Sequence, residues 1–86
     1  MLITKKIVAD KIAAYLHYDI TLEQLVDWAE HAMMDDEFDK SGLPAIRSAV
    51  SRLGVADVRA FGLPWEECEG LLRQLGFSAR VSIVAA

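Results

Sequence analysis

The chain has 86 residues, of which 53% are apolar, and 13 acidic against nine basic residues give it a formal net charge of -4. A chain of this size buries only roughly 60% of its unfolded surface, so two separate cores would each be too small, and we expect residues 1–86 to form a single helical domain. The negative charge argues against nucleic acid as a partner, because binding phosphates requires clustered Lys and Arg.

The first predicted helix begins at Thr4, whose hydroxyl can cap the first turn, and runs to about His17. No glycine marks its end. Apolar residues recur at helical spacing and predict one buried stripe. The stripe contains Ile7, Val8, Ile12, Tyr15 and Leu16.

The second predicted helix begins with a capping box, because Gln24 follows Thr21 by three residues. Ile20 and Leu25 fit the hydrophobic staple that accompanies this motif. We expect the helix to stop near Met34, since the acids that follow would oppose the helix dipole. Its inward stripe is predicted to contain Leu22, Leu25, Val26, Ala29, Ala32 and Met33, widened by Trp28.

Negative charge is concentrated in residues 19–39, which contain eight acids and no Lys or Arg. Such a stretch of one sign attracts and steers a basic partner. We expect these residues to form an acidic face, with the acids after the second helix in a loop. The predicted partner-binding residues are Glu23, Asp27, Glu30, Asp35, Asp36, Glu37 and Asp39.

A third helix is expected to begin around Pro44, with help from Ser41 or Gly42 as a cap, and to end at Gly54. A short helix is predicted at residues 57–61.

The last predicted helix opens at Pro64 and ends at Gly76. Gly70 in its middle costs about 1 kcal/mol relative to Ala, which predicts that another element crosses closely there. Trp65 and Cys68 belong to its apolar face, and we expect both to be core residues rather than binding or reactive groups.

Residues 77–84 alternate between apolar and polar, which predicts a half-buried strand. Phe77, Ala79, Val81 and Ile83 form its apolar side. A single strand cannot satisfy its own backbone groups. It could pair with residues 1–4, with the same strand of a second subunit, or with another protein by strand addition. An exposed apolar edge favours a homodimer joined through this strand.

The elements together predict a mainly α fold: a small single-domain bundle of three main helices plus one short helix, with a C-terminal β-strand at residues 77–84. One cysteine excludes an internal disulfide and is typical of a reducing compartment. No segment reaches the ~18 apolar residues of a membrane span, and the N-terminal apolar run is too short for a secretory signal. We therefore expect a cytoplasmic protein that does not associate with membranes.

No residue pattern indicates a reaction. The acids at residues 35–39 do not match a calcium-binding loop. Lys40 and Ile46 occupy the positions where such a loop requires a glycine for its turn and a bidentate glutamate. Asp27, Glu30 and His31 share one side of the second helix and could hold a metal, yet they are also its expected outward residues. We expect no catalytic residue, no metal and no cofactor.

The leading hypothesis is a non-enzymatic interaction protein that presents its acidic face to a basic protein. In charge and size alone, the chain resembles small inhibitors of basic effectors such as antitoxins and immunity proteins. The alternative is a structural homodimer, joined through residues 77–84, whose acidic face serves solubility only.

Overall fold

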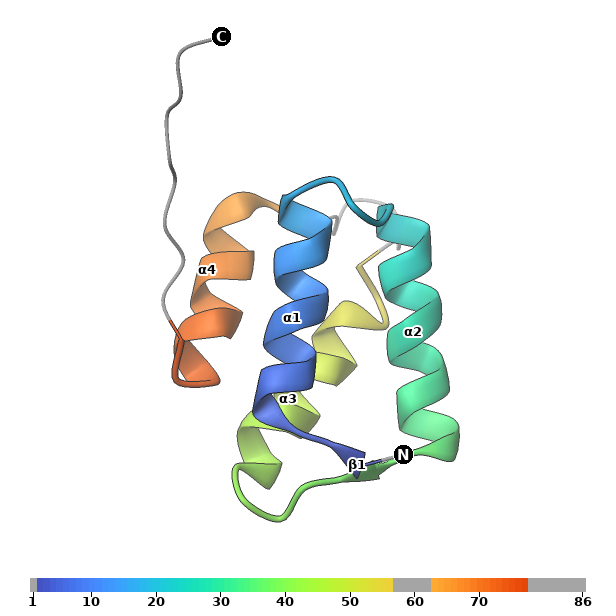
Figure 1. Cartoon of the computed structure of the whole chain (residues 1–86), viewed down its shortest axis with the longest axis vertical. Helices are drawn as coiled ribbons and strands as arrows, with labels where there is room; N and C mark the ends of the chain where they lie inside the picture. Colours follow the sequence, from blue (N-terminus) through green and yellow to red (C-terminus); the bar gives the residue numbers. More distant parts are fainter. Residues whose placement is uncertain (1, 57–62, 78–86) are drawn as a thin grey trace, which may run out of the picture.

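The computed structural model describes residues 2–56 and 63–77. In chain order these contain β1 (Leu2–Ile3), α1 (Lys5–Leu16), α2 (Leu22–Asp35), β2 (Glu37–Phe38), α3 (Leu43–Leu53) and α4 (Trp65–Gln74). α1 contacts all three other helices, and α2 packs most extensively on α3 (Figure 1). The predicted mainly α single-domain bundle is confirmed, although the described residues contain four helices of 10 to 14 residues where three main helices were expected.

α1 and α2 begin where a threonine side chain accepts a hydrogen bond from one of the first backbone N–H groups. The Thr4 hydroxyl accepts a hydrogen bond from the Ile7 N–H at 3.2 Å. In the predicted capping box, Thr21 Oγ1 accepts from the Gln24 N–H at 3.1 Å, and the Gln24 side chain accepts from the Thr21 N–H at 2.8 Å. Gly42 caps α3 through its backbone alone, with a φ of 86°. These starts confirm the sequence-based predictions, because the signals lie within three residues of one another.

α1 ends at a residue that rarely adopts the required backbone conformation. Tyr18 has a φ of 63°, in the left-handed region. Its N–H donates to the Tyr15 carbonyl at 3.1 Å, and the Asp19 N–H donates to the Ala14 carbonyl at 2.9 Å. These two bonds are the Schellman motif, in which glycine usually holds the left-handed position. A side chain there costs about 1 kcal/mol.

α4 ends with the same motif, built here on Gly76 with a φ of 91°. The Phe77 N–H donates to the Leu72 carbonyl at 2.9 Å and so closes the helix. Phe77 is not part of a strand, so the predicted strand does not begin there. Residues 78–84, with Ala79, Val81 and Ile83, lie outside the described residues, as does the short helix predicted at 57–61.

The N-terminal residues and part of the acidic run form a small parallel sheet. Leu2 lies opposite Glu37 and Ile3 opposite Phe38, and the Asp39 N–H donates to the Ile3 carbonyl at 2.9 Å. The sequence predicted a loop for these acids and suggested the C-terminal strand as a partner for residues 1–4. The described partner is β2 instead, because Ile3 is fully buried and Phe38 packs against the same core.

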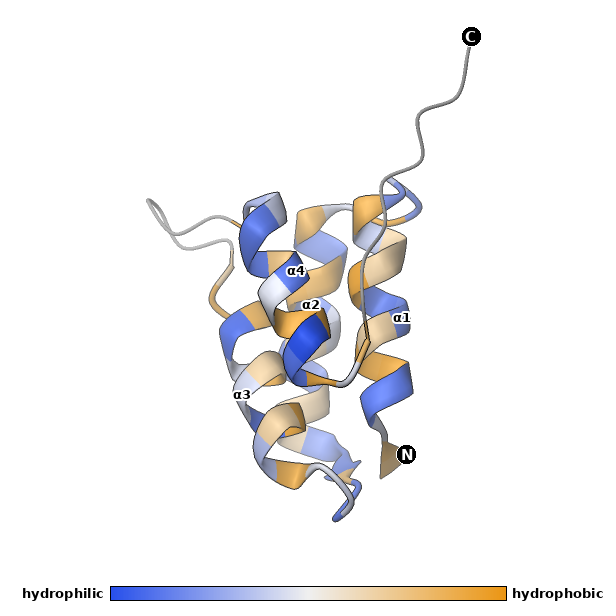
Figure 2. Ribbon diagram, turned by 90° about the vertical axis from the view of Figure 1, so that its left-hand side faces the viewer, coloured by the Kyte–Doolittle hydropathy of each residue, from blue (hydrophilic) through white to orange (hydrophobic). Residues whose placement is uncertain are grey.

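The core is entirely apolar in the described parts of the chain. Along each helix, hydrophobic segments alternate with hydrophilic ones, as expected for amphipathic helices (Figure 2). The core residues are Ile3, Val8, Ala9, Ile12, Leu25, Val26, Ala29, Ala32, Ile46, Ala49, Val50, Leu53, Ala56, Leu63, Cys68, Leu71, Leu72 and Leu75.

The close approach predicted at Gly70 occurs at a different glycine. A Cβ added to Gly70 would meet no described atom within 4 Å, so that prediction is wrong for the described residues. A Cβ on Gly54, at the end of α3, would lie 2.7 Å from the Met33 methyl carbon. Met33, expected to point inward, covers Gly54 from the edge of the core and remains 43% exposed.

Candidate functional site

Three of the predicted partner-binding acids lie on one side of α2. Glu23, Asp27 and Glu30 are spaced by four and three residues, which aligns their side chains along a helix. All three are exposed, while the opposite side of α2 packs into the core. None of the three forms an ion pair with another described residue. We call these residues the acidic row.

The other four predicted acids follow at the C-terminal end of α2, in residues 35–39, which we call the acidic run. Asp35 and Glu37 are exposed, whereas Asp36 and Asp39 are half-buried. The Asp39 carboxylate accepts a hydrogen bond from the Ser41 N–H at 3.0 Å, which shapes the turn into α3. Asp39 therefore has a local structural role that the sequence-based prediction did not include.

The seven predicted residues thus form two groups on one helix and its exit. Met34 lies between them: it follows Glu30 by four residues, so it extends the line of the acidic row, and it is 80% exposed. The surface offered by α2 is negative along two turns and ends in an apolar side chain beside the acidic run.

His31 lies beside the acidic row, and its imidazole becomes positively charged when it is protonated. Its Nδ1 lies 2.8 Å from the Asp27 carbonyl oxygen. This hydrogen bond, followed by the negative charges of Asp35, Asp27 and Glu30, raises the pKa of His31 above its ordinary value of 6.5. Falling pH therefore adds positive charge next to the acidic row.

A metal site at Asp27, Glu30 and His31 finds no support in the geometry. No group of three or more His, Cys, Asp or Glu side chains is placed to hold a metal ion anywhere in residues 2–56 and 63–77. One imidazole nitrogen of His31 is already engaged by the Asp27 carbonyl. The spacing of these residues reflects the outward side of an amphipathic helix.

Trp28 has a basic neighbour that sequence spacing did not reveal. Lys11 of α1 places its ammonium nitrogen 5.8 Å from the centroid of the Trp28 ring, within cation–π range. The contact joins α1 to α2.

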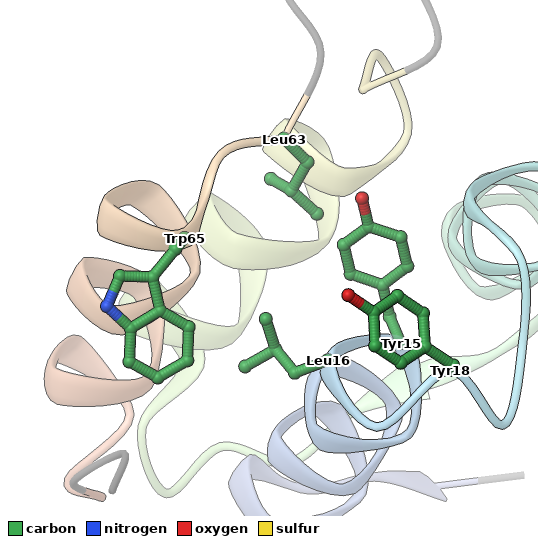
Figure 3. A pocket seen from close by; sticks show the side chains of 5 residues that line it. All are labelled: Tyr15, Leu16, Tyr18, Leu63 and Trp65. Carbon is green, nitrogen blue, oxygen red and sulfur yellow. The ribbon is translucent and has the colours of Figure 1, made fainter. Parts of the chain in front are cut away.

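A pocket of about 270 Å³ lies between the end of α1 and the start of α4. Its lining residues are Tyr15, Leu16, Tyr18, Leu63 and Trp65 (Figure 3). We call it the aromatic pocket. Trp65, predicted to be a core residue, is only half-buried and lines this pocket instead. The sequence analysis missed the site, because its two groups of residues are separated by more than 40 positions in the chain.

Cys68 is a core residue, as predicted, with no exposed surface. Burial, and then the negative charge of Glu67, raise the pKa of its thiol to about 11, although Arg52 acts in the opposite direction. Arg52 and Glu67 form an ion pair that joins α3 to α4. A buried thiol with this pKa remains protonated at neutral pH and is a poor nucleophile.

Comparisons of the chain with protein-family models, curated proteins and solved structures give no match. None of the helices in the described ranges combines the length and apolar character needed to cross a membrane.

Proposed function

We propose that this protein is a small cytoplasmic, non-enzymatic interaction protein that binds a basic partner protein through the acidic row and the adjoining acidic run. The observation that carries the proposal is the row itself: Glu23, Asp27 and Glu30 are aligned, exposed and without an ion-pair partner among the described residues. Charges arranged in this way attract an oppositely charged surface and accelerate its association.

The distribution of charge favours a binding role over a purely stabilising one. The last turn of α2 contains no basic residue, and acids follow where the helix dipole is negative. Each such charge costs the fold up to about 1 kcal/mol. Solubility requires charge, but it is served as well by mixed signs as by one sign. Attracting a basic partner, in contrast, would explain why this stretch contains acids and no Lys or Arg.

A pair of matched double variants tests the proposal. Asp27→Asn with Glu30→Gln removes two charges from the acidic row. The control, Asp10→Asn with Glu69→Gln, removes two charges elsewhere, from exposed helical pairs with Lys6 and Arg73 that contribute little to stability.

The measurement is affinity capture from a cell extract near 0.15 M salt, followed by titration with the purified captured protein. We expect a basic protein that binds wild type and control alike, binds the row variant at least tenfold more weakly, and dissociates as salt screens the charges. Equal binding by the row variant and the control would contradict the proposal.

The alternative, a structural homodimer, depends on residues 77–84 and remains a prediction. The described residues add only that Phe77, a large apolar residue at the end of α4, is 40% exposed. Deleting residues 78–86 leaves the hydrogen bond that closes α4 in place. A dimer that becomes a monomer on this deletion, measured by sedimentation, would favour the alternative; a wild-type chain that is already monomeric would exclude it.

A further inference from the structure

We infer that the aromatic pocket binds the side chain of a lysine or arginine residue of the basic partner. The inference rests on the proposed function for the source of that residue, whereas the chemistry follows from the pocket's own side chains. A volume of about 270 Å³ is slightly below the roughly 300–1,000 Å³ of pockets that hold whole small molecules. It suits one long side chain.

The lining matches the two parts of such a side chain. Tyr15, Tyr18 and Trp65 provide three aromatic rings, whose electron-rich faces attract a cation. Leu16 and Leu63 provide apolar surface for the methylene stem that Lys and Arg share. The Tyr18 hydroxyl is turned toward Leu16, while the indole nitrogen of Trp65 points away from the pocket (Figure 3). The tyrosine oxygen can accept a hydrogen bond from an ammonium or guanidinium group.

Two exposed acids among the described residues flank the pocket. Asp19 follows Tyr18 in the chain and Glu66 follows Trp65; both are exposed and lack an ion-pair partner among the described residues. α1 directs its negative C-terminal end toward the pocket, with no basic residue in its last turn. The N-terminal end of α4 has the opposite polarity, which the exposed Glu66 in its first turn offsets, whereas Glu67 is already paired with Arg52. A cation is therefore favoured over an anion.

The place of the pocket in the bundle is compatible with the same partner. The C-terminal end of α1 and the N-terminal ends of α2 and α4 lie at one end of the bundle (Figure 1). The row begins there with Glu23, in the first turn of α2. A basic partner that binds the row and also extends across this end of the bundle would bring a positive side chain to the mouth of the pocket.

The backbone at Tyr18 has a conformation in which a side chain costs stability. A glycine would adopt the φ of 63° without strain. The tyrosine side chain is 93% exposed, the highest value among the large apolar residues of the described chain. Its ring contributes little to the core and forms the outer wall of the pocket, where an entering side chain would cover it. Local strain of this kind is commonly stored at binding sites.

The test uses N-acetyl-arginine amide as the probe, with N-acetyl-citrulline amide as its uncharged analogue of the same shape. Amide NMR spectra of the full chain are recorded during titration at low salt. We expect shifts centred on residues 15–18 and 63–66, a dissociation constant in the millimolar range, and at least fivefold weaker binding of the citrulline compound. Equal affinity for the two compounds, or no shifts at these residues, would overturn the inference.

Two substitutions of Tyr18 separate the contribution of its ring to binding from its effect on folding. Tyr18→Gly removes the ring and also relieves the strained backbone, so lost binding cannot be attributed to unfolding. We expect it to weaken arginine binding about tenfold, equivalent to about 1.4 kcal/mol. Tyr18→Phe retains the ring and should stay within about threefold of wild type. Unchanged binding by Tyr18→Gly would refute the role assigned to this residue and its pocket.

The row variant distinguishes failure of this inference from failure of the proposed function. Asp27→Asn with Glu30→Gln leaves the pocket intact and should bind the arginine probe like wild type. If the probe binds while the row variant still captures every partner, the proposed function fails and the pocket assignment stands. If the row variant loses its partner and the probe never binds, only the pocket assignment fails.

Discussion

α1 and α4 end with the same pair of backbone hydrogen bonds but with opposite residue types at the left-handed position. At the end of α4 that position holds Gly76, whose conformation is free of strain. At the end of α1 it holds Tyr18, which is strained and almost fully exposed. The motif alone does not require tyrosine. Gly76 thus ends its helix without strain, whereas Tyr18 ends its helix at a cost in stability and also lines a pocket.

The largest change in the free energy of unfolding is expected for a substitution of Gly76, at the end of α4. Gly76→Ala introduces a Cβ at a φ of 91° and should lower the free energy of unfolding by about 1–2 kcal/mol. The space around Gly76 is open in the described chain, so the effect would come from the backbone and not from a clash. Chemical denaturation of the purified variant measures it. A stability equal to that of wild type would show that α4 does not depend on this motif.

The reverse substitution at the other end should stabilise the protein. Tyr18→Gly is expected to raise the free energy of unfolding by about 1 kcal/mol, partly offset by the greater freedom of glycine in the unfolded chain. Thermal unfolding should show a midpoint several degrees higher, since about 1 kcal/mol shifts a domain of this size by roughly 4–8 °C. Tyr18→Ala, which keeps the strain but removes the ring, is the control and should not stabilise.

Gly70 of α4 is expected to respond to substitution in the opposite way from Gly76. It lies inside the helix, without a left-handed φ and without a described atom within 4 Å of an added Cβ. Gly70→Ala should therefore raise the free energy of unfolding by about 0.5–1 kcal/mol, opposite in sign to Gly76→Ala. Denaturation of the two single variants in parallel checks the signs. A destabilised Gly70→Ala variant would revive the prediction that another element crosses there.

The smallest effect on stability is expected from His31, near the end of α2, and this effect depends on pH. The pKa of His31 is raised in the folded state, so the stability that its protonated form contributes is complete below the ordinary pKa of 6.5 and is lost as pH rises through the folded pKa. Because His31 is fully exposed, the change should be small. Thermal midpoints of wild type and His31→Gln between about pH 5 and 8 should converge at the alkaline end. A constant difference across this range would contradict the assignment.

The helix starts could be predicted because their signals are local. Thr21 and Gln24 identify the start of α2, and each hydrogen bond they form spans three residues. Gly76 marks the end of α4 in the same way, and Cys68 is recognised as a core residue by its place in an apolar stripe. The acidic row was also predictable, because helical spacing alone places Glu23, Asp27 and Glu30 on one side.

The amino-acid sequence by itself thus determined the helical class, the starts of the helices and the side of α2 that carries negative charge, all through interactions a few residues apart. Only the tertiary structure decided the pairing of β1 with β2, the contact of Lys11 with Trp28, and the pocket built from residues 15–18 and 63–65. These contacts join segments that are distant in the chain, and they depend on how the helices pack around one apolar core. The left-handed conformation of Tyr18 was likewise visible only in the structure, because nothing in the neighbouring sequence predicts it.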